Sequence, residues 1–374
     1  MSSTWKSRLS LSIFGQSHAA GIGMTLDGIP AGERIDTGKL QAFLNRRAPG
    51  RFPWATSRRE EDVPEFLSGF VGGKTCGAPI AAVIRNQNTR PADYDELKDV
   101  PRPGHADFTA HIKYSGFQDV SGGGHFSGRL TAAMCIAGGI CLQILERRGI
   151  SIGAHILSVG GIYDQMFDAE KIGASALSAL RDMEFPVLDN EYAPVMIKAI
   201  EEAKKDGDSL GGSIECAVIG LPPGLGDPIF GGMENRISSL VFGIPAVRGI
   251  EFGSGFFAAS MRGSHHNDPF YWDGDAVKTR GNNHGGILGG ITSGTPLIFR
   301  VAIKPTPSIG KEQESVSLSR KEPAVLAVRG RHDPCIAPRA VPCVEAVAAI
   351  AIFDAILEQE GNCATRREQR YELK

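Results

Sequence analysis

The chain has 374 residues, 42% of them hydrophobic and 22% charged, so it can bury a large core and is typical of one large soluble domain or two ordinary ones. Its 40 lysines and arginines nearly balance 42 aspartates and glutamates, and the net charge of -2 gives no indication of a nucleic-acid or membrane partner. The 47 glycines follow no G-x-y period, which excludes a collagen-like chain and predicts many turns and close approaches of backbone to a ligand.

The cysteines and the N-terminus indicate the compartment. Seven cysteines occur at irregular spacing without a C-x-x-C pair, and the first residues lack the apolar stretch of a signal peptide. Both features predict reduced thiols in a cytoplasmic protein. The most apolar run, residues 132–145, is too short and too rich in glycine to predict a span of a bilayer about 30 Å thick.

Side-chain periodicity predicts strands and helices that alternate without a regular βαβ cadence. In chain order we expect a strand at 9–14, a helix at 37–47, a strand at 77–84, helices at 128–148 and 192–205, strands at 213–219, 249–252 and 297–303, and a helix at 342–358. The last helix is placed after Pro342 because proline suits a first helical turn. The pattern favours an α+β fold of one large domain, residues 1–360, followed by a polar, frayed tail at 361–374.

The first candidate for chemistry is His18, which lies among small residues directly after the first predicted strand. An imidazole with an ordinary pKa of about 6.5 can exchange a proton with a ligand at neutral pH. The alternative is a histidine that only closes a tight turn. The sequence alone leaves both open.

Arginines are concentrated on the segment that follows the first predicted helix. Five of them lie within residues 46–59, on either side of a Pro-Gly pair. Guanidinium groups match the geometry of carboxylate and phosphate, so the run predicts a small anionic ligand. The alternative is a solvated charged run that is partly neutralised by Glu60, Glu61 and Asp62.

The densest pattern joins RPGHAD at 102–107 to SGGGHFSGR at 121–129, directly before an apolar helix. Glycines that lead into a helix N-terminus offer backbone N–H groups to an anion. The pattern is neither a Walker A loop nor a G-x-G-x-x-G fingerprint, so by itself it predicts no nucleotide. With His105, Ser127 and Arg129 nearby, it predicts part of an anion site.

Three further segments complete the candidate site: NNHGGILGG at 282–290, KPTPS at 304–308 and RGRHDPCIAPR at 329–339. The last could be a structural ion-pair cluster or an acid–base group beside a ligand. His265, His266 and Asp268 match no standard zinc spacing, so no metal is predicted. Together the segments predict an enzyme site for a small, multiply anionic substrate.

Read in order, these segments resemble chorismate synthases over about residues 9–358. The resemblance rests on GQSH at 15–18, where the family has GESHG, and on RPGHAD at 102–107, GGG at 122–124, GGILGG at 285–290, KPTPS at 304–308 and GRHDPC at 330–335, followed by RAVP at 339–342.

The resemblance implies a β-α-β sandwich that assembles as a homotetramer and uses reduced FMN. The implied reaction is the anti-1,4-elimination of phosphate from 5-enolpyruvylshikimate 3-phosphate, which gives chorismate for aromatic amino-acid biosynthesis without net oxidation. Either NADPH bound by the protein itself or a separate flavin reductase would reduce the flavin, and both remain open.

The resemblance also implies roles for individual residues. His18 would protonate the leaving phosphate, His105 would keep the reduced flavin in its protonation state, and Asp333 would assist proton movement at the flavin. Ser17 and Ser127 would be relay hydroxyls. The implied flavin contacts are Ser127, Ala246, Gly289, Lys304, Pro305, Thr306, Pro307, Ser308 and Arg331. The candidate arginines for substrate or NADP are Arg47, Arg51, Arg129 and Arg339.

The sequence departs from the family beside these residues. Gln16 and Ala19 flank His18 in place of a glutamate and a glycine, and Pro53 stands where a second arginine is expected. His125 and Phe126 replace an arginine and a serine at the flavin, so His125 could carry the missing charge or only fill space. A flavin oxidoreductase and a diverged binding protein without turnover are therefore the alternatives to a lyase.

Overall fold

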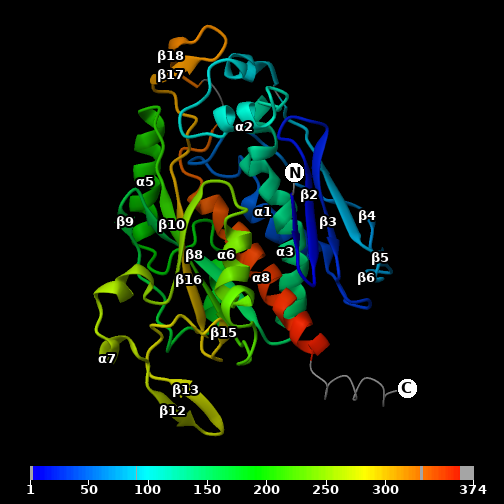
Figure 1. Ribbon diagram of the computed structural model, residues 1–374, viewed down its shortest axis with the longest axis vertical. Coiled ribbons are helices and arrows are strands. Elements are labelled where there is room, and N and C mark those ends of the chain that lie inside the picture. The colour runs from blue at the N-terminus through cyan, green and yellow to red at the C-terminus, as the bar shows by residue number, and fades with distance from the viewer. Residues whose placement is uncertain (1–2, 90, 329–331, 363–374) are drawn as a thin grey trace.

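Two five-stranded antiparallel sheets lie on either side of a layer of helices in the computed structural model, which describes residues 3–89, 91–328 and 332–362 (Figure 1). The first sheet contains, in spatial order, β1 (Thr4–Lys6), β2 (Ser10–Gly15), β3 (Gly21–Asp27), β7 (Ile80–Arg85) and β4 (Glu65–Ser68). The second contains β11 (Val247–Phe252), β16 (Leu297–Ile303), β10 (Gly212–Ile219), β8 (Ser151–Val159) and β9 (Ile162–Tyr163).

The other elements are helices and two-stranded ribbons. The helices are α1 (Thr37–Arg47), α2 (Asp107–Lys113), α3 (Thr131–Arg147), α4 (Ala174–Asp182), α5 (Tyr192–Lys205), α6 (Met233–Val241), α7 (Gly263–His266) and α8 (Ala337–Asn362). The ribbons pair β5 (Phe70–Val71) with β6 (Lys74–Thr75), β12 (Phe270–Asp273) with β13 (Ala276–Thr279), β14 (Ile287–Leu288) with β15 (Ile291–Thr292), and β17 (Gln313–Ser317) with β18 (Glu322–Leu326).

The middle layer is built around α3 and α8. A Cβ added at Gly138 of α3 would lie 2.3 Å from the Cα of Ala346 on α8, so the two helices approach as closely as glycine permits. Both are long and apolar enough to cross a membrane by length and composition. However, 89% and 94% of their apolar windows are buried inside the fold, as expected for core helices.

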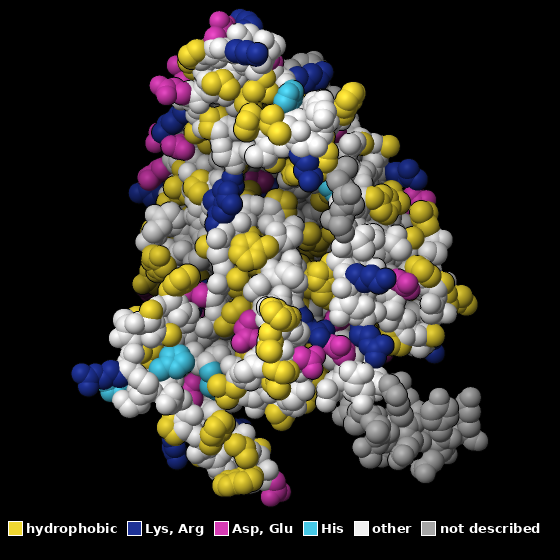
Figure 2. Space-filling model, viewed as in Figure 1, with side chains coloured by type: hydrophobic (Ala, Val, Ile, Leu, Met, Phe, Trp, Pro, Cys, Tyr) yellow, Lys and Arg dark blue, Asp and Glu magenta, His cyan; other side chains and the backbone are white. Residues whose placement is uncertain are grey.

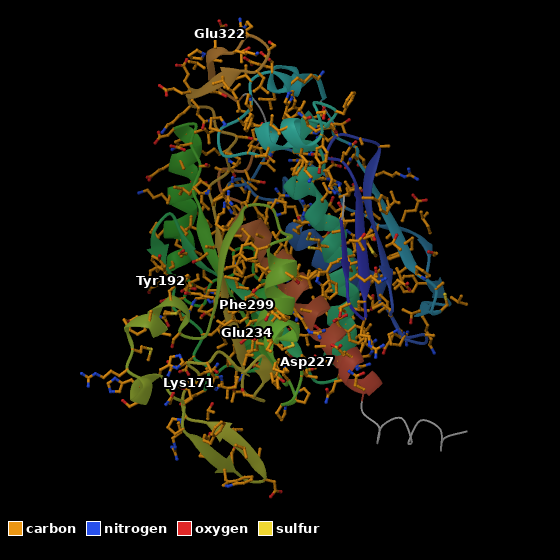
Figure 3. All side chains as sticks on the ribbon, viewed as in Figure 1. Lys171, Tyr192, Asp227, Glu234, Phe299 and Glu322 are labelled. Atoms are coloured by element: carbon orange, nitrogen blue, oxygen red, sulfur yellow. The ribbon has the colours of Figure 1, made fainter. Side chains whose placement is uncertain are left out.

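The largest of three hydrophobic clusters joins both sheets to the middle layer. It includes Met24 of the first sheet, Ile140 of α3 and Phe299 of the second sheet, all of which are fully buried. Figure 3 labels Phe299 beside the middle helices, in the interior of the molecule. The predicted α+β sandwich is confirmed.

The predicted elements correspond closely to the observed ones. The helices at 37–47 and 192–205 and the strand at 297–303 coincide with α1, α5 and β16. The prediction for α8 was wrong at its start, because the helix begins at Ala337 and contains Pro342. Pro338 therefore takes the first-turn position expected for Pro342. Residues 361 and 362 end α8, and the rest of the expected tail lies outside the described residues.

Candidate active site

A cavity of about 700 Å³ brings together residues from segments that lie far apart in the sequence. Its walls come from residues 17–18, 47–58, 102–109, 122–131, 242–248, 304–308 and 332–343. This volume lies within the range usual for small-molecule and cofactor sites. Of the glycine-rich and basic segments that the sequence singles out, 282–290 lies outside this cavity wall.

His18 enters the cavity from the loop between β2 and β3. Asn86 holds this loop by donating through Nδ2 to the carbonyl oxygens of residues 16 and 19, at 3.0 and 2.8 Å. Arg58 donates to both the hydroxyl and the carbonyl oxygen of buried Ser17, each at 3.1 Å. The centroid of the His18 ring lies 5.0 Å from that of the Tyr94 ring. The His18 ring is also so close to Gly122 that a Cβ added to Gly122 would lie 2.2 Å from two ring atoms. Tyr94 and Gly122 therefore restrict where the His18 ring can lie.

His105 presents a proton acceptor to the same cavity. Its Nδ1–H donates to the Asp107 carboxylate at 2.6 Å, and Arg102 pairs with that carboxylate at 2.7 Å. Burial lowers the pKa of His105, and the Arg102 charge lowers it further against the attraction of Asp107. The imidazole is therefore neutral at pH 7, and Nε2 is left as an acceptor beside Gly123.

Asp333 lies between two segments of the cavity wall. One carboxylate oxygen accepts from the backbone N–H of Thr56 at 2.9 Å, and the other pairs with Arg339. Thr306 donates to the carbonyl oxygen of Asp333 at 2.8 Å. The carboxylate is thus held at the cavity with a guanidinium group as its partner.

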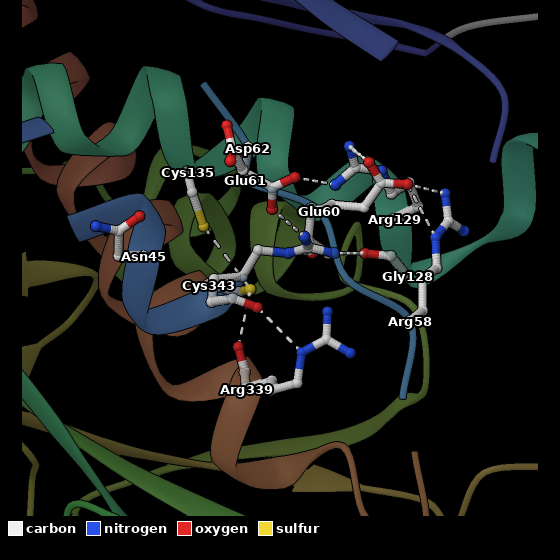
Figure 4. A network of polar contacts seen from close by, with 12 residues as sticks. Asn45, Arg58, Glu60, Glu61, Asp62, Gly128, Arg129, Cys135, Arg339 and Cys343 are labelled. Carbon is white, nitrogen blue, oxygen red and sulfur yellow. Dashed lines mark hydrogen bonds and ion pairs between the residues drawn. The ribbon is translucent and has the colours of Figure 1, made fainter. Parts of the chain in front are cut away.

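Two of the predicted ligand arginines, Arg47 and Arg129, share a buried carboxylate. Arg47 donates to Asp62 at 2.8 Å, to Thr131 at 3.0 Å and to the Gly128 carbonyl oxygen at 2.9 Å. Arg129 also pairs with Asp62, and Figure 4 labels both of these residues. Burial favours a raised pKa for Asp62, but the two guanidinium groups hold it below its usual value. Both arginines line the cavity, yet their main partners are protein groups.

Two other cations are better placed to meet a ligand. Arg248, at the start of β11, is exposed at the cavity and forms no ion pair with any residue that the structure describes. Lys304 also lines the cavity, where its Nζ donates to the Gly104 carbonyl oxygen and where burial and the nearby Arg248 lower the pKa of Lys304. Sequence reasoning missed Arg248, because a single arginine in a strand forms no pattern.

Most of the residues proposed from the sequence meet at this cavity. Those that line it are Ser17, His18, Arg47, His105, Ser127, Arg129, Ala246, Lys304, Thr306, Pro307, Ser308, Asp333 and Arg339. Some are also used by the fold: Ser127 caps the turn before α3, and Ser308 accepts from Arg102 at 3.0 Å.

Four proposed residues are not placed there. Gly289 lies in the turn between β14 and β15, and exposed Pro305 does not line the cavity. Arg51 lines a separate cavity of about 360 Å³, so the structure does not bring it to the cavity that Arg47 and Arg129 line. Arg331 lies outside the described residues.

His125 lines the cavity, but the fold uses both of its ring nitrogens. Nδ1 donates to the Gly15 carbonyl oxygen at 2.8 Å, and Nε2 lies 2.6 Å from the Ser3 hydroxyl, from which it can accept. A neutral imidazole satisfies both contacts, and so does an imidazolium, because the serine hydroxyl can also accept. Two protein groups therefore fix the position of the ring at the cavity wall.

The described residues contain no group of three or more His, Cys, Asp or Glu side chains arranged to hold a metal ion. Asp268, considered above with His265 and His266, instead accepts from the side chain of Asn283 at 3.0 Å and from the backbone N–H of His284 at 3.1 Å. It therefore has a structural role in its loop.

Comparison with known proteins agrees with this site. A family model described as chorismate synthase matches residues 9–357. A chorismate synthase from Korarchaeum cryptofilum is 46% identical over 353 residues, which cover 93% of this chain and 96% of the relative. One from Lancefieldella parvula is 46% identical over 377 residues, with 96% and 99% covered. A solved chorismate synthase structure superposes with a TM-score of 0.73 and 30% identity over 97% of this chain and 96% of that chain. The chain therefore belongs to the chorismate synthase family, whose members are enzymes of the lyase class.

Proposed function

We propose that the protein converts 5-enolpyruvylshikimate 3-phosphate to chorismate and phosphate by anti-1,4-elimination, with reduced FMN as cofactor and no net redox change, in the shikimate pathway. One observation carries the proposal. Two imidazoles and a carboxylate, from His18, His105 and Asp333, line one cavity together with several cationic side chains. The substrate has two carboxylates and a phosphate, which suits those cations.

The residues present also fit a flavin mononucleotide. Ala246 lines the cavity with a positive φ of 74°, a left-handed conformation rare outside glycine, and Gly122 and Gly123 let the rings of His18 and His105 lie close against the backbone. Arg248 and Lys304 supply positive charge for a phosphate group. When bound, the reduced flavin would lend electron density to the substrate and take up the ring proton.

The chain's own residues would bind the substrate and move protons. His18 would donate a proton to the leaving phosphate oxygen, with its loop held by Asn86 and Arg58. Neutral His105 would accept at Nε2 on the flavin side, while Asp107 fixes its tautomer by accepting from Nδ1–H. Asp333 would accept and pass on a proton at the cavity wall.

An anaerobic assay tests this function against its alternatives. Chemically reduced FMN and 5-enolpyruvylshikimate 3-phosphate are mixed with the protein, and chorismate absorbance is followed together with the flavin spectrum. A lyase makes many equivalents of chorismate while the flavin stays reduced. An oxidoreductase oxidises the flavin in step with product, and a binding protein without turnover makes no chorismate.

We further propose a cytoplasmic homotetramer whose flavin is reduced by NADPH or by a separate reductase. Large apolar side chains on the surface support self-association, including Phe230, which is 89% exposed, Phe256 at 85% and Trp272 at 73%. Figure 2 shows hydrophobic side chains on the viewed face, including on the β12–β13 ribbon at the bottom. Sedimentation equilibrium measures the assembly, and oxidation of NADPH by the purified protein with FMN separates the two routes of reduction.

The Asp333→Asn variant should keep the fold and flavin binding but lower turnover at least tenfold, which is about 1.4 kcal/mol on the barrier. An amide retains an oxygen for the Thr56 N–H but cannot accept a proton as a carboxylate does. Steady-state rates at saturating substrate check this, with Asp208→Asn, which removes a surface carboxylate paired with Lys311, as the control. Wild-type turnover in Asp333→Asn would exclude a proton-transfer role.

The Arg248→Ala variant should weaken binding of reduced FMN about tenfold or more, because a charged contact to phosphate in a partly enclosed site contributes about 1.5–3 kcal/mol. Anaerobic titration of the flavin measures the dissociation constant. The control is Arg262→Ala, which removes another exposed arginine that lies outside the cavity wall. Equal affinities in all three proteins would show that Arg248 does not meet the phosphate.

A further inference from the structure

Two buried cysteines face each other within the middle layer, one on α3 and one on α8. The sulfur atoms of Cys135 on α3 and Cys343 on α8 lie 3.8 Å apart, and both side chains are buried (Figure 4). One helical turn further along each helix, Gly138 and Ala346 form the close backbone contact described above. A disulfide requires a separation of about 2.05 Å, so the sulfurs need to approach by about 1.8 Å between two helices that are already in contact.

The two thiols differ in exposure to the cavity and in charge. Cys343 lines the cavity wall and Cys135 lies behind it. The hydrogen bond donated by Cys135 lowers the pKa of Cys343 to about 7 against the effect of burial, and the Arg47 charge helps. Burial instead raises the pKa of Cys135. Because the thiolate is the reactive form, Cys343 is the sulfur that meets an oxidant first.

We propose that Cys135 and Cys343 are a redox modification site, at which a peroxide that enters the cavity converts the two thiols to a reversible disulfide. The Cys343 thiolate attacks one peroxide oxygen, the O–O bond breaks, and the hydroxide that leaves becomes water after taking up a proton. The Cys135 sulfur then attacks the resulting sulfenic acid, the S–O bond breaks, and the thiol proton leaves with the oxygen as a second water. The thiols lose two electrons, and the peroxide gains them.

This chemistry does not depend on the proposed function, although a reduced flavin that meets dioxygen is a source of peroxide in the same cavity. The consequence for the protein is a covalent link between the two helices of the middle layer. The link would also remove the Cys343 thiolate, which the Arg47 charge at the cavity wall favours.

Peptide mapping of the full-length protein without reduction tests the proposal. Cys76, the exposed cysteine among those that the structure describes, is first removed by Cys76→Ser, the protein is treated with hydrogen peroxide, and the remaining thiols are blocked with iodoacetamide. We expect a crosslinked pair of peptides that contain Cys135 and Cys343 and that separate on treatment with dithiothreitol. The crosslink should be absent from Cys135→Ala but present in Cys141→Ala, a matched control because Cys141 is a buried thiol on the same helix. If the Cys76→Ser protein yields no such crosslink, the proposal is wrong.

The order of attack has its own test. In Cys135→Ala the sulfenic acid on Cys343 has no partner, so dimedone should label Cys343 after peroxide treatment. If Cys135→Ala does not fold, Cys135→Ser keeps a side chain of similar size and the same test applies. Labelling of Cys335, or of no cysteine, while Cys343 remains a free thiol would overturn the assignment of Cys343 as the attacking sulfur.

Discussion

The Gly122→Ala variant should lose turnover by a hundredfold or more while it keeps its fold. A Cβ at this position would lie 2.2 Å from two atoms of the His18 ring, so the imidazole has to move. Displacement of a reacting group by about 1 Å can cost a hundredfold in rate, or about 2.7 kcal/mol on the barrier. The measurement is the steady-state rate of chorismate formation, with circular dichroism to confirm the fold.

The control for Gly122→Ala is Gly149→Ala. Gly149 has a similar positive φ, 78° against 60°, but a Cβ there would meet nothing within 4 Å. Both substitutions therefore carry the cost of a left-handed alanine, about 1–2 kcal/mol of stability. Only Gly122→Ala displaces His18. If the two variants lose turnover equally, backbone strain rather than the histidine explains the loss.

The Asp62→Asn variant should lower the free energy of unfolding by about 3 kcal/mol or more at pH 7. Asp62 is the shared partner of Arg47 and Arg129, and removing one partner of a buried pair leaves uncompensated charge. Asparagine is the right replacement because Asp62 has a positive φ of 53°, which asparagine tolerates. The midpoint of urea unfolding measures the loss.

The surface pair of Glu65 and Arg85 supplies the control for Asp62→Asn. Glu65→Gln breaks an exposed pair, whose contribution is usually about 0–1 kcal/mol. Equal urea midpoints for Asp62→Asn and Glu65→Gln would contradict the structural role of Asp62.

The Asp62 carboxylate should also make the stability of the folded protein depend on pH. The pKa of Asp62 is lower in the folded protein than its ordinary value of 3.8, so the folded state binds its proton less readily than the unfolded chain. The stability contributed by the Asp62 charge is therefore present above about pH 4 and is lost as the pH falls through the folded pKa. The stability difference between wild type and Asp62→Asn should be constant from pH 6 to 8 and should shrink below pH 4.

Periodicity and local signals account for the elements that the sequence predicts well. The helix at 37–47 has an aspartate cap, Asp36, that accepts from the Lys39 N–H, and basic residues in its last turn. The predicted start of α8 was wrong because either of two prolines, Pro338 and Pro342, could occupy the first turn of the helix. Which proline does so depends on how the chain packs into the middle layer, and the local sequence does not show this.

The sequence could identify arginines near the site but not their partners. Arg47 and Arg51 are four residues apart, yet one donates to Asp62 beside the main cavity and the other lines a second cavity. Arg248 is isolated in the sequence but faces the main cavity. All three residues carry the same guanidinium group. They differ in which hydrogen-bond acceptors the tertiary fold brings close to each one. His125 shows the same limit, because its partner Ser3 is 122 positions away.

The position of α8 also bears on how the chain folds as it leaves the ribosome. This helix fills the middle of the sandwich, against α3, β8 and β10, yet it is formed from the last described residues of the chain. Until it has been synthesised, the apolar faces of those earlier elements have no partner, and α3 alone is apolar enough to resemble a membrane span. The apolar surfaces of the nascent chain are therefore exposed for most of its synthesis. Chains in this state are prone to aggregate, and chaperones protect them.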